Sequence, residues 1–190
     1  PDRMVLLLAV WKICKSLDQN TFDPFLLHGV TGSGKTEVFI EAARHAINQG
    51  KSAVVLLPEI STTPQIAGRF KAVFGDIVAV WHSKLSKSSR NWIWKKICEE
   101  EFKIIVGARS AIFTPLKNLG LIIVDEEQES AYKQTSSSLK YHAKEVSLMR
   151  GKINNATVIL SSATPSIESY HNYKNKKFKY LELPKRYGEA

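Results

Sequence analysis

Short runs of apolar residues alternate along this chain with longer segments whose apolar residues recur every three or four positions. The short runs predict strands buried on both faces of a sheet, where apolar residues need not alternate with polar ones. We expect strands at 25–28, 52–57, 77–81, 103–106, 120–124, 157–161 and 179–183. The segments with helical spacing predict helices at 4–17, 37–48, about 64–74, about 87–100, about 141–150 and 166–173.

This regular alternation predicts an α/β fold: an open, mainly parallel, twisted sheet with helices on both faces. A chain of 190 residues is long enough for one well-cored domain and short for two. In the first helix we expect one packing face, formed by Met4, Leu7, Leu8, Trp11 and Cys14. In the second helix we expect the inward residues Val38, Phe39, Ala42, Ala43 and Ala46.

The segment between the first expected strand and the second expected helix fits the phosphate-binding pattern G-x-x-x-x-G-K-[ST] without a mismatch. It reads Gly29, Val30, Thr31, Gly32, Ser33, Gly34, Lys35 and Thr36. In the strand–loop–helix setting, backbone N–H groups of residues 30–35 converge on an anion at a helix N-terminus. Lys35 then reaches the outer phosphates and the Thr36 hydroxyl ligates Mg²⁺. The segment predicts a nucleoside triphosphate site.

An acidic segment follows the expected strand 120–124 directly. A carboxylate at the end of a buried strand can hold the Mg²⁺ that bridges the β- and γ-phosphates, and we assign this role to Asp125. A neighbouring carboxylate can orient and activate the attacking water, a role that falls to Glu126. Taken alone, the segment could also be an acidic turn that ends a strand. The phosphate loop upstream favours the metal site, because such a loop needs this partner.

A hydroxyl-rich segment, 161–165, follows the expected strand 157–161. Ser162 and Thr164 could sense the γ-phosphate or reach the acidic segment through hydrogen bonds. Serine and threonine before a proline also occur in ordinary turns. All three segments follow predicted strands, so we expect them to share the edge of the sheet where ligands bind in this class of fold.

The net charge of the chain indicates the class of its binding partner. The chain has 27 lysines and arginines against 18 acidic residues, a formal charge of +9, which favours a polyanionic partner without choosing between nucleic acid and acidic lipid. Cys14 and Cys98 lack the spacing of a zinc site or a disulfide framework, so we expect reduced thiols in the cytosol. The apolar run 4–10 is too short to span a membrane and lacks a signal-peptide cleavage pattern. Because the chain begins at Pro1, we expect it to be an excised fragment.

The three segments in this order resemble the first motor lobe of helicase superfamily two. The stretches between them are similar to the bacterial primosomal replication-restart helicases, the primosomal protein N′ family, over about residues 26–188. The segments that carry this likeness are 58–65, 82–83 with Arg90 and Trp94, 107–115, 125–127, 132–134, 141–143 and 162–165.

The resemblance implies a RecA-like P-loop NTPase lobe at residues 1–184, followed at 185–190 by the start of a linker to a second lobe. It implies an ATP-dependent 3′-to-5′ DNA helicase of the bacterial cytoplasm that acts in replication restart at stalled forks and uses ATP and Mg²⁺. The implied partners are DNA as single strands and forks, primosome proteins and single-strand-binding protein, with no membrane. The family's zinc-binding cysteines are absent here, so zinc is expected only in a missing part of a longer protein.

Carried over residue by residue, the resemblance implies catalytic roles for Lys35, Asp125 and Glu126. It implies roles in coupling for Gln128, Ser162 and Thr164. It also implies DNA contacts, with base stacking by the tyrosines and phosphate contacts by the cations, at Arg109, Ser110, Tyr132, Lys133, Tyr141 and His142. The two tyrosines could instead be packing residues of a solvated loop.

The chain departs from the family pattern at three positions. Gln128 stands where the family usually has His, Lys84 where it tends to have Gly, and Ser161 where it has Gly. An amide at 128 can still donate and accept hydrogen bonds but cannot titrate, which puts the strength of coupling in doubt.

Two alternatives remain open: another superfamily-two translocase, or a nucleotide-gated binding module or small phosphate-loop kinase. Because a second lobe would supply an arginine finger, we expect these 190 residues alone to bind nucleotide weakly and to hydrolyse it slowly or not at all.

Overall fold

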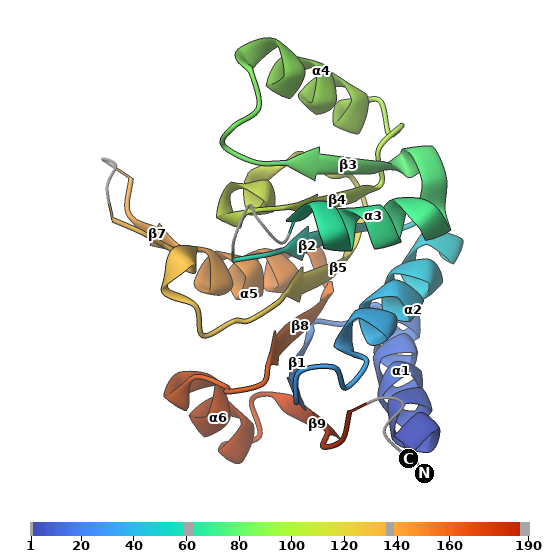
Figure 1. Cartoon of the computed structure of the whole chain (residues 1–190), viewed down its shortest axis with the longest axis vertical. Helices are drawn as coiled ribbons and strands as arrows, with labels where there is room; N and C mark the ends of the chain where they lie inside the picture. Colours follow the sequence, from blue (N-terminus) through green and yellow to red (C-terminus); the bar gives the residue numbers. More distant parts are fainter. Residues whose placement is uncertain (1, 59–62, 136–138, 187–190) are drawn as a thin grey trace.

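A seven-stranded sheet forms the centre of the protein (Figure 1). The structure is a computed structural model and describes residues 2–58, 63–135 and 139–186. Parts of the segments 58–65 and 185–190 therefore lie outside the described residues, as do residues 136–138. The sheet has the order β3-β4-β2-β5-β8-β1-β9, and every neighbouring pair is parallel. Its strands are β1 (Asp23–Gly29), β2 (Ser52–Leu56), β3 (Val78–Trp81), β4 (Ile104–Gly107), β5 (Leu119–Val124), β8 (Thr157–Ser162) and β9 (Lys179–Leu183).

Helices cover both faces of the sheet, as the sequence predicted (Figure 1). They are α1 (Asp2–Gln19), α2 (Lys35–Asn48), α3 (Thr63–Phe74), α4 (Lys87–Cys98), α5 (Ala143–Asn154) and α6 (Ile167–Lys174), with short 3₁₀ helices at η1 (Gly75–Ile77), η2 (Arg109–Phe113) and η3 (Ser130–Tyr132). Because side chains alternate along a strand, each strand feeds two cores. One core packs against α1, α2 and α3, and the other against α4, α5 and η2.

The first helix is present, but its expected packing face is wrong. Met4 and Trp11 are 74% and 56% exposed, and Leu7 and Leu8 are also exposed. The buried face is instead formed by Leu6, Ala9, Ile13 and Leu17. Both sets have helical spacing, because almost every residue from 4 to 11 is apolar, and periodicity alone could not choose between them. The inward residues expected in α2 are all buried, so that prediction is confirmed.

A two-stranded antiparallel hairpin was not predicted from the sequence. It pairs β6 (Lys133–Gln134) with β7 (Tyr141–His142) and stands outside the main sheet. As a result α5 begins at Ala143, two residues after the expected start of that helix. Two-residue strands carry too little periodicity to be recognised in a polar segment.

None of the helices in the described part of the chain is long and apolar enough to cross a membrane.

Candidate nucleotide-binding site

The phosphate-binding loop lies between β1 and α2 and has the backbone of an anion cradle. Gly32 and Gly34 have φ values of 80° and 90°, a region that residues with a Cβ atom rarely adopt, and Gly34 is the N-cap of α2. A Cβ atom at Gly29 would lie 2.6 Å from the Ser33 hydroxyl oxygen. That buried hydroxyl has no hydrogen-bond partner among the described residues, so it is available to a bound group. The loop thus presents backbone N–H groups and a hydroxyl at a helix N-terminus.

A cavity of about 360 Å³ opens over this loop. It is lined by Thr31, Gly32, Gly34, Lys35, Thr36, Glu37, Arg69 and Glu126. The Lys35 ammonium donates a hydrogen bond to the Gly29 carbonyl at 2.8 Å and lies 3.6 Å from a carboxylate oxygen of Glu126. The structure therefore brings the lysine of the loop and the second carboxylate of the acidic segment to one cavity.

The acidic segment begins at the end of β5, between β2 and β8 in the sheet order. The Asp125 N–H donates to the Leu56 carbonyl at 3.0 Å, and the Glu126 N–H donates to the Asp125 carboxylate at 3.1 Å. Glu126 has a φ of 47°, so the chain turns sharply here. Burial, followed by the nearby Glu126, raises the pKa of Asp125 to about 6. This carboxylate lacks full compensation from protein cations.

These groups fit a nucleotide and Mg²⁺. The cradle, the helix N-terminus and Lys35 suit the phosphates. Mg²⁺ usually keeps several waters and takes one or two protein oxygens besides the phosphates. The Thr36 hydroxyl and the Asp125 carboxylate are the oxygens available for it, and a cation next to a buried carboxylate favours its ionised form.

Gln128 contacts the acidic pair directly. Its side-chain amide donates to Glu126 at 3.0 Å, and its carbonyl oxygen is buried with no partner among the described residues. The amide thus contacts the carboxylate that is expected to orient water, two residues earlier in the same segment. Lys35 and Gln128 together fix the position of that carboxylate.

The hydroxyl-rich segment begins with the last two residues of β8, the strand that lies between β5 and β1 in the sheet. Ser162 is buried, and its hydroxyl accepts a hydrogen bond from the Thr164 N–H at 2.8 Å, while the Thr164 residue is exposed. His28, which the sequence did not single out, lies in β1 and contacts the same segment: its Nε2 is 3.2 Å from the Ala163 carbonyl and its Nδ1 is 2.7 Å from the Tyr180 hydroxyl. A carbonyl only accepts, so Nε2 carries the proton.

Glu127 links the acidic segment to elements far away in sequence, and sequence reasoning missed it. Its carboxylate accepts hydrogen bonds from the Lys144 ammonium at 3.0 Å, the Ser166 N–H at 2.7 Å and the Ser169 hydroxyl at 2.9 Å. The Glu127 and Lys144 side chains are 0% and 8% exposed. Ser166 is also the N-cap of α6, since its hydroxyl accepts from the Ser169 N–H. We name these four residues the Glu127 cluster.

Arg109 and Tyr132 form part of the framework beside the site. One guanidinium nitrogen of Arg109 donates to the carbonyls of Ala131 and Lys133, both at 3.1 Å. Tyr132 is fully buried, and its hydroxyl donates to the carbonyls of Leu56 at 3.1 Å and Asp125 at 2.5 Å. The expectation that Tyr132 stacks on a DNA base is therefore wrong: its ring belongs to the core, and it connects two strand ends.

The remaining residues expected on the DNA side lie at or near the surface. Lys133 is exposed, and Ser110, Tyr141 and His142 are half-buried. The Tyr141 ring packs edge-on against Phe113, a residue 46% exposed, with ring centroids 5.0 Å apart. Burial, with Lys144 nearby, lowers the pKa of His142, so this ring is neutral near pH 7. A partly exposed aromatic pair on the hairpin that also carries Lys133 suits single-stranded nucleic acid.

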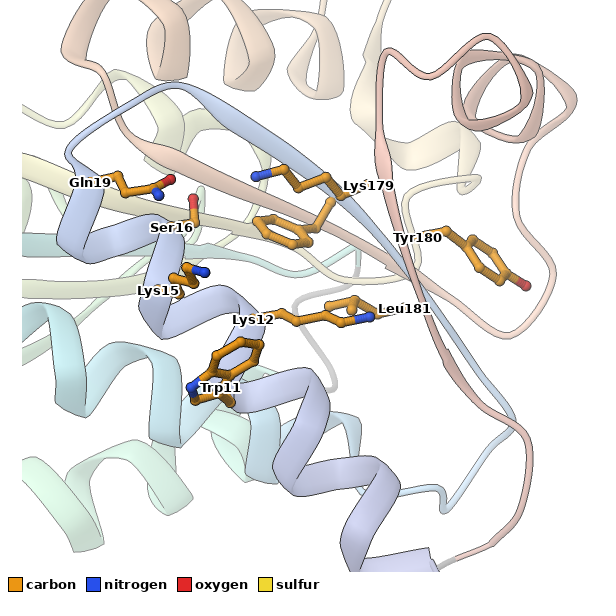
Figure 2. Close-up of a pocket in the computed structure, with 9 residues that line it drawn as sticks. Trp11, Lys12, Lys15, Ser16, Gln19, Lys179, Tyr180 and Leu181 are labelled. Atoms are coloured by element: carbon orange, nitrogen blue, oxygen red, sulfur yellow. The ribbon is translucent and has the colours of Figure 1, made fainter.

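A second cavity, of about 520 Å³, lies between α1 and β9, away from the phosphate-binding loop (Figure 2). Trp11, Lys12 and Lys15 border it from α1, whereas the labelled Tyr180 side chain points away from it. Lys179, on the opposite wall, pairs with Asp23 at 2.6 Å. Its lysines belong to an open surface, and no sequence motif is associated with it.

Comparisons with known proteins agree with this geometry. Residues 11–173 match the family described as DEAD/DEAH box helicase. The chain is 50% identical over 182 residues to replication restart protein PriA of Chlamydia pneumoniae, which covers 96% of this chain and 24% of the relative. It is 49% identical over 174 residues to replication restart protein PriA of Bacillus subtilis (strain 168), and this match covers 92% of this chain and 22% of the relative. The chain thus spans about a quarter of the length of these curated relatives.

The structure is similar to that of RecG bound to a three-way DNA junction, with a TM-score of 0.64 and 21% identity, covering 96% of this chain and 24% of that one. At this identity the likeness shows the fold alone. It confirms the expected RecA-like lobe.

Proposed function

The chain belongs to the DEAD/DEAH box helicase family, and on that premise we propose that it is the ATP-binding motor lobe of a DNA helicase that acts in replication restart. The identity of about half of all residues to two replication restart proteins, over more than nine-tenths of this chain, supports that choice within the family. In this proposal the longer protein unwinds DNA in the 3′-to-5′ direction at stalled forks, in the bacterial cytoplasm.

The observation that carries the proposal is the meeting of Lys35 and Glu126 over the phosphate-binding loop, 3.6 Å apart in one cavity. A lysine on the phosphates and a carboxylate that can orient water are the two parts that nucleotide hydrolysis needs from a first lobe. A module that only binds nucleotide would not require the second part. This arrangement therefore favours an enzyme that hydrolyses ATP over such a module.

ATP bound with Mg²⁺ supplies the phosphoanhydride bond whose hydrolysis drives movement. The backbone N–H groups of the loop and the Lys35 ammonium stabilise the negative charge that develops on the phosphates. Thr36 and Asp125 hold the metal. The Glu126 carboxylate accepts a proton from water and aims the oxygen, while Lys35 and Gln128 keep that carboxylate in place.

DNA is the proposed polyanionic partner, in agreement with the charge of +9. Contacts are proposed for Arg109, Ser110, Lys133, Tyr141 and His142. The Arg109 guanidinium presents five N–H donors, so donors beyond the two that hold carbonyls can reach a phosphate. Coupling by Gln128, Ser162 and Thr164, and contacts of the longer protein with primosome proteins and single-strand-binding protein, belong to the same proposal.

Nucleotide binding is the first test. We expect titration of this chain with a fluorescent ATP analogue to give saturable, Mg²⁺-dependent binding that Lys35→Ala lowers at least about tenfold, because the charged contact to the phosphates is lost. Arg44→Gln is the matched control, since Arg44 pairs with Glu41 on the exposed side of α2. Equal binding by the wild type and Lys35→Ala would contradict the site.

DNA binding is the second test. Labelled single-stranded DNA titrated at two salt concentrations should show an affinity that falls as salt increases, because neutralised phosphates release counterions. Duplex and single strands compared at one salt concentration report the preferred form. Absence of binding, or an affinity that does not change with salt, would favour a phosphate-loop protein that does not act on DNA.

A further inference from the structure

The wall of the nucleotide cavity contains a cation that no motif predicted. Arg69 comes from the middle of α3 and lines the cavity together with the phosphate-binding loop. Its guanidinium pairs with the carboxylate of Glu37, which follows Thr36 in the first turn of α2. Among the described residues that line the cavity, Arg69 and Lys35 are the two cations, and they come from different helices.

Glu37 by itself would disfavour an anionic ligand. Its carboxylate lines the cavity in which the phosphates are proposed to bind, and like charges repel at such short distances. The paired guanidinium cancels this charge. A carboxylate can accept two of the five N–H donors that a guanidinium presents, so donors remain for a further oxygen.

Both side chains are 45% exposed, so a ligand in the cavity can reach them. An ion pair this exposed contributes little to the stability of the fold. A merely structural link between α2 and α3 is therefore a weak account of why two opposite charges face this cavity.

We propose that Arg69 is a nucleotide-binding residue that contacts the terminal phosphates of a nucleoside triphosphate, and that Glu37 positions its guanidinium. This inference rests on the proposed function of the cavity and deepens it. Arg69 supplies, from within this lobe, a second cation beside Lys35. Because it lies on α3, bound triphosphate also connects that helix to the phosphate-binding loop.

The test compares ATP and ADP binding to this chain in the presence of Mg²⁺, by calorimetry. Arg69→Gln should weaken ATP about tenfold and ADP no more than about threefold, because a charge-assisted bond to the last phosphate is lost. Arg69→Lys should recover part of the ATP affinity, because the charge remains without the planar fork. Glu37→Gln should weaken ATP less than Arg69→Gln does, because the guanidinium loses the carboxylate that positions it but keeps its own charge.

A structural pair would behave differently. Arg69→Gln and Glu37→Gln would then weaken ATP equally and would weaken ADP by the same factor, which would overturn the inference. So would unchanged ATP affinity in Arg69→Gln. Thermal unfolding of every variant shows that the fold is retained, and Arg44→Gln again serves as the arginine control.

Lys35→Ala distinguishes a failure of the proposed function from a failure of the inference about Arg69. If the wild type binds no nucleotide, or if Lys35→Ala binds as well as the wild type, the proposed function fails. If Lys35→Ala abolishes binding and Arg69→Gln does not discriminate between ATP and ADP, only the inference about Arg69 fails.

Discussion

The buried pair of Glu127 and Lys144 offers a direct test of how the acidic segment is held. Replacing Lys144 by Met keeps the length of the side chain but leaves a carboxylate with no cation at a site where Glu127 is 0% exposed. Replacing Glu127 by Gln leaves the opposite charge, an ammonium 8% exposed, without its partner. In each single variant, one buried charge loses its compensation.

Breaking a buried ion pair on one side costs about 3–5 kcal/mol. The Ser166 N–H and the Ser169 hydroxyl still donate to Glu127 in Lys144→Met, so we expect the lower part of that range. The double variant contains no buried charge, and the new Gln can donate to the same serine hydroxyls. We therefore expect the double variant to lose only about 1–2 kcal/mol, less than either single variant.

Urea unfolding monitored by tryptophan fluorescence measures these differences. With a slope of about 2 kcal/mol/M, Lys144→Met should shift the midpoint down by about 1.5–2 M, Glu127→Gln by about 1.5–2.5 M, and the double variant by about 1 M or less. The pair of Lys95 and Glu99 at the C-terminal end of α4, with side chains 73% and 40% exposed, provides the control cycle with coupling near zero. Additive losses in the double variant, or a loss below about 1 kcal/mol in Lys144→Met, would refute this account of the cluster.

Three further predictions concern other parts of the chain. Burial, aided by Asp18 and Glu41, raises the pKa of Cys14 to about 11, whereas Cys98 is exposed. Iodoacetamide at pH 8 should therefore alkylate Cys98 first, and mass spectrometry of timed samples would show the order. In Gly107→Ala the added Cβ atom would overlap the carbonyl oxygen of Trp81, so we expect the free energy of unfolding in urea to fall by about 1–3 kcal/mol. An unchanged midpoint would count against the close approach of β3 and β4 at this residue. Tyr132→Phe should lower the free energy of unfolding by about 1–3 kcal/mol, because two buried carbonyls lose their donor, and should leave the affinity for single-stranded DNA unchanged. Tyr141→Ala should lower that affinity about fivefold or more. The opposite pattern in a fluorescence titration would show that Tyr132, and not Tyr141, contacts DNA.

Much of the fold and part of the site could be predicted because they rest on local patterns. Seven apolar runs became seven parallel strands, and a strand, a glycine loop and a helix met at residues 29–36 as predicted. Lys35 and Glu126 could be placed in one site because the ends of parallel strands share an edge. The Gln128 hydrogen bond also agrees with what its amide allows.

Other residues received their roles from contacts that local patterns do not record. Tyr132 lies in a polar segment beside Lys133, which favoured a surface position, yet its ring fills the core and its hydroxyl connects β2 with the acidic segment. The buried face of α1 could not be chosen, because two apolar stripes compete on one helix and only the surface formed by α2, β8 and β9 decides between them.

By itself, then, the sequence determined the class of fold, the order of its elements and the phosphate-binding loop, because backbone propensity and periodicity act over a few neighbouring residues. Tertiary structure alone decided which charges meet. Glu127 and Lys144, and likewise Glu37 and Arg69, lie 17 and 32 positions apart in the chain, and they pair because the sheet brings their elements together. Electrostatic partners depend on distance in space, and no pattern along the chain specifies that distance.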